Sequence, residues 1–173
     1  MSKGDVNFED KNIEYYTPKY IVNMFGDFDY DPATTEDKAV DLGVKFYDTE
    51  ETNGLLADWS LHKKIWVNPP FNIKHLFFQK AVDTYKQVKN DIYFLCPIEF
   101  LTTKRFYNAI NGIGVKIFIP SGRIKFESGV GLNERSPAFG SVIVKLQDKN
   151  EVCFFDLTQV SAKIKEQSDV AED

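Results

Sequence analysis

The sequence predicts an α/β domain with a mainly parallel sheet and an antiparallel hairpin near the C-terminus. Short apolar runs alternate with segments whose apolar residues recur at helical spacing, which is typical of strand–helix–strand units. Residues 92–96 are apolar throughout, as expected for a strand buried on both faces of a parallel sheet. Residues 141–146 and 151–157 are strand-like runs joined by a short polar segment, which predicts the hairpin.

Each element follows from local pattern. The segment Tyr15-Tyr16-Thr17-Pro18 predicts a helix start, with Thr17 as N-cap and Pro18 at the first helical position, and Gly26 predicts its end. Residues 28–31 alternate as a strand that breaks at Pro32. In order, the chain then predicts a helix from Thr34 or Thr35 to Gly43, strands at 44–47, 55–59 and 64–67, helices at 72–89 and 103–111, a strand at 115–119 and a long loop at 121–140.

Composition predicts one domain. With 173 residues, 43% hydrophobic and 14% aromatic, the chain can bury a single core. We expect a polar lead at 1–14, the domain at 15–160 and an acidic, flexible tail at 161–173. No apolar run has the length of a membrane span or a signal core, so we expect a cytoplasmic protein; the sequence does not predict its oligomeric state.

Cysteine and histidine spacing predicts no metal site. Cys96 and Cys153 each stand alone in an apolar run and are expected to be core residues in a reducing compartment. His62 and His75 have no acidic or sulfur partner at ligand spacing. We therefore expect surface histidines and no metal cofactor.

The most informative stretch is Asn68-Pro69-Pro70-Phe71, which follows a predicted strand. The prolines fix φ, remove backbone donors and force the chain out of the sheet. The side-chain oxygen of Asn68 and the carbonyl of Pro69 can then point outward as paired acceptors, with the Phe71 ring beside them. This corner suits an NH2 group on a planar ring, because the acceptors take both N–H hydrogens while the aromatic ring stacks on the plane.

That geometry would activate an amine such as that of adenine. Its lone pair is delocalised into the ring, and holding both hydrogens out of the plane favours a tetrahedral nitrogen aimed at an electrophile. With a sulfonium methyl group as the electrophile, neither a metal nor a strong base is required.

Acidic residues are expected to share a rim with this corner. Asp31, Asp48, Asp58 and Asn68 each follow a predicted strand. Ligands of parallel sheets bind outside the carboxyl ends of the strands, so the four residues are candidates for one site. Each acid taken alone is as readily explained as a solvated loop carboxylate.

The order of the motifs resembles that of S-adenosylmethionine-dependent DNA adenine-N6 methyltransferases, and most closely the small phage Dam-type family. The resemblance implies a Rossmann-like methyltransferase fold, S-adenosylmethionine as cofactor, double-stranded DNA as partner and, if phage-encoded, the host cytoplasm as location. It extends from Tyr15 to Leu146 through Thr17-Pro18, Asp31-Pro32-Ala33, an acid after the next strand, Asp58-Trp59, Asn68-Pro69-Pro70-Phe71, Phe94-Leu95-Cys96-Pro97, Gly122-Arg123-Ile124-Lys125-Phe126 and Ser136-Pro137-Ala138-Phe139-Gly140-Ser141.

The resemblance also implies roles for the cofactor residues. Tyr16-Thr17-Pro18 and Asp31 would contact the methionine end, and free N–H groups after Pro32-Ala33 would receive its carboxylate. Many methyltransferases have a Gly-rich turn where this chain has Pro32-Ala33-Thr34-Thr35. The remaining implied assignments are Asp48, or instead Glu50 or Glu51, to the ribose hydroxyls, Asp58 to the cofactor's adenine amine, and Trp59 to an apolar wall beside it.

For the substrate, the resemblance implies that Asn68 and Pro69 grip the target amine and that Phe71 stacks on a base rotated out of the duplex. The net charge of −5 weighs against a nucleic-acid substrate, although positive residues cluster locally. A chain this short is expected to read only a short site. The candidates for DNA contacts are Lys104, Arg105, Arg123, Lys125 and Arg135.

Alternative functions keep part of this interpretation. The same corner and cofactor would also suit cytosine N4, an RNA base or a protein glutamine, and the acidic net charge favours a protein acceptor. A further alternative is a catalytically silent decoy that binds DNA or protein. The presence of Asp31, Asn68 and Phe71 argues against the decoy.

Overall fold

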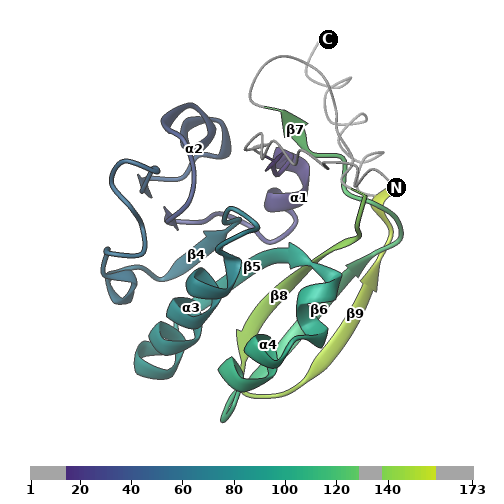
Figure 1. Cartoon of the computed structure of the whole chain (residues 1–173). Helices are drawn as coiled ribbons and strands as arrows, with labels where there is room; N and C mark the ends of the chain where they lie inside the picture. Colours follow the sequence, from purple (N-terminus) through teal and green to yellow (C-terminus); the bar gives the residue numbers. More distant parts are fainter. Residues whose placement is uncertain (1–14, 129–137, 159–173) are drawn as a thin grey trace, which may run out of the picture.

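The computed structural model describes residues 15–128 and 138–158 (Figure 1). The predicted lead at 1–14, the predicted tail at 161–173 and the DNA-contact candidate Arg135 lie outside the described residues.

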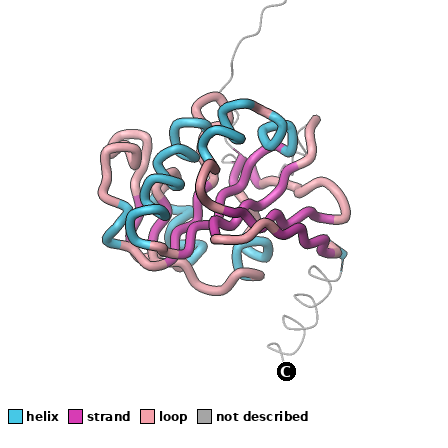
Figure 2. The backbone as a smooth tube through the Cα atoms, turned by 90° about the horizontal axis from the view of Figure 1, so that it is seen from below, coloured by secondary structure: helices cyan, strands magenta, loops and turns pink. Residues whose placement is uncertain are grey.

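A seven-stranded sheet in the order β3-β2-β4-β5-β8-β6-β9 forms the centre, and helices lie on both sides of it (Figure 2). Within it, β8 is antiparallel to its neighbours β5 and β6, and the other neighbouring pairs are parallel. The predicted α/β class with a mainly parallel sheet is therefore confirmed. The strands are β2 (Tyr30–Asp31), β3 (Phe46–Tyr47), β4 (Lys64–Val67), β5 (Asp91–Pro97), β6 (Gly114–Pro120), β8 (Ser141–Gln147) and β9 (Glu151–Phe155).

The predicted C-terminal hairpin is wrong. β8 and β9 are consecutive in sequence, but β6 lies between them and pairs with both. The connection from β8 to β9 crosses the first residue of β6, where a Cβ on Gly114 would lie 2.4 Å from the Lys149 backbone. The crossing is held by Asn150, whose Oδ1 accepts from the Val115 N–H at 3.0 Å. Only a glycine leaves room for the chain to pass over β6 in this way.

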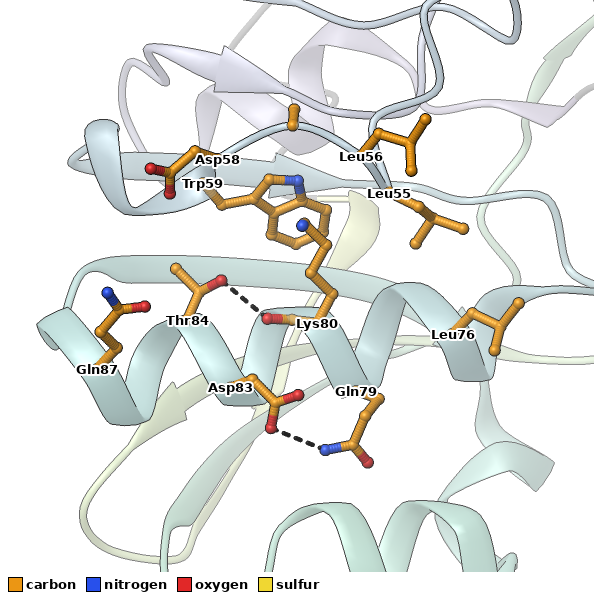
Figure 3. Close-up of a pocket in the computed structure, with 11 residues that line it drawn as sticks. Leu55, Leu56, Asp58, Trp59, Leu76, Gln79, Lys80, Asp83, Thr84 and Gln87 are labelled. Carbon is orange, nitrogen blue, oxygen red and sulfur yellow. Dashed lines mark hydrogen bonds between the residues drawn. The ribbon is translucent and has the colours of Figure 1, made fainter.

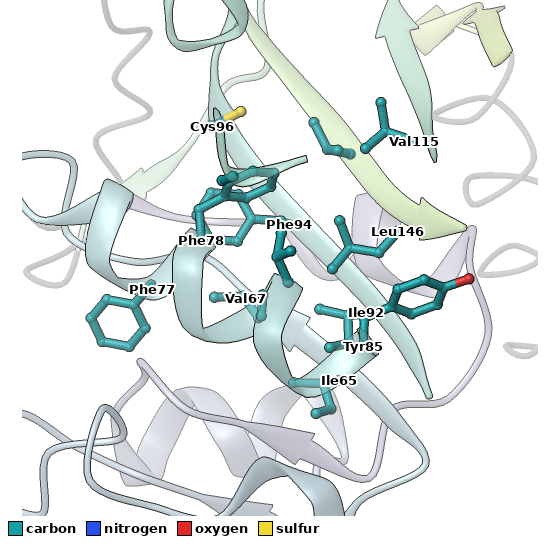
Figure 4. Packing of buried hydrophobic residues seen from close by; sticks show 14 of the residues in the cluster. Ile65, Val67, Phe77, Phe78, Tyr85, Ile92, Phe94, Cys96, Val115 and Leu146 are labelled. Carbon is teal, nitrogen blue, oxygen red and sulfur yellow. The ribbon is translucent and has the colours of Figure 1, made fainter. Parts of the chain in front are cut away.

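Helices cover both faces of the sheet. The helices are α1 (Lys19–Asn23), α2 (Glu36–Leu42), α3 (Lys74–Val88) and α4 (Lys104–Ala109). On one face, Phe78 of α3 packs in a core with Phe94 of β5 (Figure 4). Phe106 of α4 stacks on Phe78 in the same core. On the other face, Ile21 of α1 shares a core with Trp66 of β4. Each central strand therefore buries both of its faces, which explains the continuous apolar run in β5.

The start of α2 agrees with the predicted cap, and α4 has a cap of the same kind. The Thr35 hydroxyl accepts from the Lys38 N–H at 3.3 Å, and α2 ends at Gly43 with φ 69°. The Thr103 hydroxyl likewise accepts from the Phe106 N–H at 3.2 Å at the start of α4.

Two other local predictions are wrong. Tyr15–Tyr16 form a strand, β1, which pairs antiparallel with β7 (Glu127–Ser128), and α1 begins only at Lys19, so Thr17 does not cap it. The strand predicted at residues 55–59 is replaced by turns and a short 3₁₀ helix, η1 (Trp59–Leu61). Pairing with the distant strand β7 replaces the expected helix start at Tyr15. The hydrogen bond from the Ser60 N–H to Asp58 forms η1 in place of the expected strand.

The described residues contain no helix that combines the length and the apolar character required to cross a membrane.

Candidate active site

The carboxyl ends of β2, β3 and β4 carry three of the predicted site residues. Asp31 ends β2, Asp48 follows β3 and Asn68 follows β4. The Asp48 N–H donates to the Asp31 carbonyl at 3.0 Å, so the two acids lie on adjacent chains. The predicted convergence of these three residues on one rim is confirmed.

The Asn68 amide is held by the N-terminal segment. Its Nδ2 donates to the Tyr15 carbonyl at 2.7 Å and to the Thr17 hydroxyl at 3.1 Å. Thr17 is only 3% exposed, so competition from water is small. Because the amide nitrogen uses its hydrogens within the protein, the Asn68 Oδ1 is oriented away from these partners as an acceptor.

The Phe71 ring lies between two other aromatic rings. Tyr15 stacks on it with centroids 5.6 Å apart and an interplanar angle of 22°, and Phe139 approaches edge-on at 5.2 Å. The Lys74 Nζ donates to the Phe71 carbonyl at 2.7 Å, which ties the turn to α3. Tyr15 therefore occupies one flat face of the ring on which the sequence predicts a base to stack.

Asp31 is a buried carboxylate. It is 2% exposed, and its Oδ1 accepts from the Ala33 N–H at 3.0 Å. Burial raises the pKa of Asp31 to about 7, against the opposing effect of the Ala33 bond. Among the ion pairs of the described residues, none joins a lysine or arginine to this carboxylate. Such a group fits a ligand that brings its own ammonium.

Asp48 is fixed on the rim by a neighbouring tyrosine. The Tyr30 hydroxyl donates to the Asp48 Oδ2 at 2.5 Å, and burial together with this bond raises the pKa of Tyr30. Glu50 and Glu51 are exposed. Which of these three acids faces a ligand hydroxyl stays a prediction.

The turn after Asp31 uses its own donors. The Ala33 N–H bonds to Asp31, and the Thr34 N–H donates to the Asp48 carbonyl at 3.0 Å. The loop after β3 closes over the turn, since a Cβ on Gly54 would lie 2.0 Å from the Pro32 carbonyl oxygen. The role expected for these N–H groups toward a ligand carboxylate stays a prediction, and these two are already bonded.

Asp58 does not lie at a strand end, and that part of the prediction is wrong. Its carboxylate caps η1 by accepting from the Ser60 N–H at 3.0 Å and from the Ser60 hydroxyl at 2.6 Å. Trp59 is 1% exposed. Both residues line a hollow of about 660 Å³ along α3 (Figure 3), to which neither Asp31 nor Asn68 contributes.

Basic residues follow the carboxyl ends of β5 and β6. Lys104 and Arg105 begin α4, while Arg123 and Lys125 lie in the segment after β6, and all four are exposed. Because β5 and β6 run parallel to β4, these residues follow strand ends on the same edge of the sheet as Asn68. Their contact with DNA stays a prediction.

The site also contains aromatic residues that the sequence interpretation did not assign. Tyr15, Phe139 and Tyr30 contact Phe71 or Asp48, and His62 stacks on Tyr30 with centroids 4.1 Å apart. The contacts of Tyr15 and Phe139 with Phe71 depend on the fold, so local patterns did not indicate them. Among described residues, no group of three or more His, Cys, Asp or Glu is placed to hold a metal ion.

A mainly parallel α/β sheet with carboxylates and an acceptor–aromatic corner at the carboxyl ends of its strands is the arrangement of an enzyme that binds its ligands at that edge. The chain belongs to the DNA N-6-adenine-methyltransferase (Dam) family, whose family model matches residues 12–170. It is 27% identical over 165 residues to the DNA N-6-adenine-methyltransferase of Escherichia phage T1, covering 84% of this chain and 68% of the phage protein. The protein is therefore an adenine-specific DNA methyltransferase, and its cofactor is S-adenosylmethionine.

Two solved structures are similar to parts of this chain. One, assigned as an O-methyltransferase from Agrobacterium tumefaciens, is 9% identical with a TM-score of 0.41, covering 74% of this chain and 67% of that chain. The other, from Listeria monocytogenes, is assigned as a class I S-adenosylmethionine-dependent methyltransferase. It is 15% identical with a TM-score of 0.40, covering 79% of this chain and 53% of that chain.

Proposed function

We propose that this methyltransferase acts on an adenine rotated out of double-stranded DNA and held at the corner from Asn68 to Phe71. The observation that carries the proposal is the pair of hydrogen bonds from Asn68 Nδ2 to Tyr15 and Thr17. They orient Asn68 Oδ1 before any substrate arrives. An acceptor fixed in advance is worth more in the transition state than one that must reorganise.

Each residue of the rim has a separate role in the proposed mechanism. Bound S-adenosylmethionine supplies an activated methyl group, which neither the base nor the protein has to generate. Asp31 holds the α-ammonium of the cofactor, and Asp48 accepts from its ribose hydroxyls. Asn68 Oδ1 and the Pro69 carbonyl accept the two hydrogens of the adenine N6 amine, while Pro70 keeps the corner rigid.

Phe71 stacks on the target base, and this requires one rearrangement. The Tyr15 ring covers one face of Phe71, and Phe139 approaches its edge. A base can use the covered face only when the Tyr15 ring moves aside. The base then replaces one aromatic stack with another, which offsets part of the cost of leaving the duplex.

DNA is held by the exposed cations after β5 and β6. Lys104, Arg105, Arg123 and Lys125 supply local positive charge on the rim, although the chain as a whole has a net charge of −5. Local charge is sufficient for phosphate contacts at a short site, and such binding weakens as salt rises.

The proposal is tested with labelled S-adenosylmethionine and four acceptors: duplex DNA, single-stranded DNA, RNA and a mixture of proteins. We expect label in duplex DNA, recovered as N6-methyladenine after digestion to nucleosides. Label in N4-methylcytosine, in RNA or in protein would contradict the proposed acceptor, and absence of label in every sample would favour a silent binder. Methylation-sensitive nucleases then locate the recognition site.

A further inference from the structure

A second hollow, of about 220 Å³, begins directly after the corner from Asn68 to Phe71. It is formed by the start of α3, the end of β5, the short helix η2 (Ile98–Thr102) and the start of α4. The polar residues in its lining are Asn72, Lys74, His75, Glu99, Thr103 and Arg105.

Positive charge and hydrogen-bond donors predominate in this hollow. Lys74 and Arg105 supply an ammonium and a guanidinium, His75 adds an imidazole ring, and Glu99 is the one carboxylate in the lining. A guanidinium fork with an ammonium and an imidazole is the donor set that recognises phosphate oxygens. The chemistry of the hollow therefore fits a phosphate group.

The hollow is connected to the catalytic turn through Lys74. Its Nζ donates to the Phe71 carbonyl at 2.7 Å and lies 5.6 Å from the centre of the Phe100 ring. Lys74 thus contacts the turn that carries Phe71 while lining the hollow. A charge bound in the hollow would act on an ammonium that already positions the turn.

The pKa of His75 depends on the charged groups around it. Its partial burial, and then the charges of Arg105 and Lys74, hold the pKa of His75 below its usual value. The charged groups that line the hollow around it are Lys74 on α3, Glu99 on η2 and Arg105 on α4. An anion placed among these groups would reverse the effect and favour the protonated imidazole.

We propose that this hollow binds one backbone phosphate of the target DNA strand, beside the nucleotide that is rotated toward Asn68. The inference rests on the proposed duplex substrate. A nucleotide that leaves the stack brings its flanking phosphates toward the rim, and the hollow starts at Asn72, the residue after Phe71. Neutralising that phosphate holds the rotated nucleotide in register with the corner.

The first test compares neighbouring charges. Arg105→Gln removes a cation from the hollow, Lys104→Gln removes the adjacent cation outside its lining, and Lys86→Gln removes one from the last turn of α3. Binding of a fluorescent 20-base-pair random duplex is measured by anisotropy over a salt series. We expect Arg105→Gln to weaken binding about tenfold and lower the salt slope by about 1, Lys104→Gln to weaken it about threefold or less, and Lys86→Gln to have no effect.

Equal losses in Arg105→Gln and Lys104→Gln would overturn the inference, because diffuse surface charge would then explain both. All variants should bind S-adenosylmethionine like the wild type, which excludes misfolding. If the wild type methylates no DNA at all, the proposed function fails. If it methylates DNA and the two variants still match, only the phosphate site fails.

The second test uses the histidines as probes. The chain has only two, so their ring protons can be followed by NMR, with His75→Gln giving the assignment. Adding the duplex should raise the pKa of His75 by about 1, and Arg105→Gln should abolish the rise. The ring signals of His62 serve as the internal reference. Inorganic phosphate alone should give a smaller rise; a response to free phosphate but not to duplex would overturn the assignment to DNA. An unmoved His75 in the presence of duplex would do the same.

Because a bound phosphate favours the protonated ring, DNA affinity should increase as pH falls through the range in which His75 titrates. His75→Gln should lose that dependence while keeping most of the affinity at about pH 8, where the ring is neutral. A pH dependence that survives unchanged in His75→Gln would contradict the proposed role of this ring.

Discussion

Asn68 and Asp31 lie at the same edge of the sheet, but they differ in their partners. The Asn68 amide nitrogen has hydrogen-bond partners within the protein, whereas the Asp31 carboxylate has no positively charged partner among the described residues. Asn68 has its amide nitrogen bonded to Tyr15 and Thr17. Asp31 is buried, and the described residues provide it with no ion pair, so its pKa rises to about 7. In the proposed mechanism, the Asn68 acceptor is oriented before the base arrives, although the Tyr15 ring must still leave Phe71, while Asp31 gains its partner charge only from the cofactor.

The largest expected effect is at the preorganised corner. Asn68→Ala removes the oriented acceptor and should lower the single-turnover rate of methyl transfer by roughly 10²-fold or more. Binding of S-adenosylmethionine, measured by calorimetry, should be preserved, since Asp31 is untouched. Wild-type turnover in this variant would remove Asn68 from the mechanism.

A change at Asp31 is instead expected to lower the affinity for S-adenosylmethionine. Asp31→Asn removes the charge that pairs with the cofactor ammonium, which is worth about 1.5–3 kcal/mol for a charged hydrogen bond. The dissociation constant for S-adenosylmethionine should therefore rise by about 10- to 100-fold. Calorimetry at about pH 8, where Asp31 is ionised, gives the measurement, and an unchanged affinity would place the ammonium elsewhere.

The positioning of Asn68 by Thr17 gives an intermediate effect. Thr17→Val removes one of the two partners of the amide and should lower kcat about fivefold, as expected for one lost hydrogen bond of about 1 kcal/mol. Thr17→Ser keeps the hydroxyl and should restore most of the rate. The resemblance assigned Thr17 to the cofactor, so a rise in KM for S-adenosylmethionine with unchanged kcat would favour that role over positioning.

The buried Asp31 also predicts how stability depends on pH. Its pKa of about 7 in the folded protein is higher than that of a carboxyl group in an unfolded chain. The stabilisation is therefore complete at low pH and is lost as pH rises through about 7. Between about pH 5 and about pH 8, the cofactor-free protein should lose roughly 2 kcal/mol more unfolding free energy than Asp31→Asn, as measured by urea denaturation. If the unfolding free energies of the two proteins changed with pH in parallel, Asp31 would already be ionised at about pH 5, and the prediction would be wrong.

The smallest effect is expected at Asp58. Its carboxylate caps η1 through Ser60, so Asp58→Ala should lower the melting temperature slightly. Its effect on the dissociation constant for S-adenosylmethionine should stay within about threefold, which is less than one charged hydrogen bond. A loss as large as that of Asp31→Asn would restore the cofactor role implied by the resemblance.

Sequence reasoning succeeded where the determinant is local. Strand β4 and its break before Pro69 follow from an apolar run and two prolines, and the cap of α2 at Thr35 follows from residue type. Asp31 and Asn68 share a rim because parallel strands end at the same edge. The Asp58-x-Ser60 pattern was also local, and it could have been recognised as a cap rather than a ligand contact.

The errors arose where distant segments meet. The pairing of β1 with β7 joins Tyr15 to Ser128, and the insertion of β6 between β8 and β9 depends on Gly114 and Lys149. No periodicity within either segment indicates which strand it will pair with. The contact between Tyr15 and Phe71 was missed for the same reason, since the Tyr15 segment was expected to open a helix.

The crossing over Gly114 constrains the order in which the sheet assembles. β9 pairs with β6 at the edge of the sheet, so it cannot join the sheet before β6 does. As an edge strand, β9 is therefore expected to detach before β6 and β8, so its amides should exchange with solvent earlier than theirs. A side chain larger than hydrogen at position 114 would release this one strand and leave the rim that carries Asp31 and Asn68 in place.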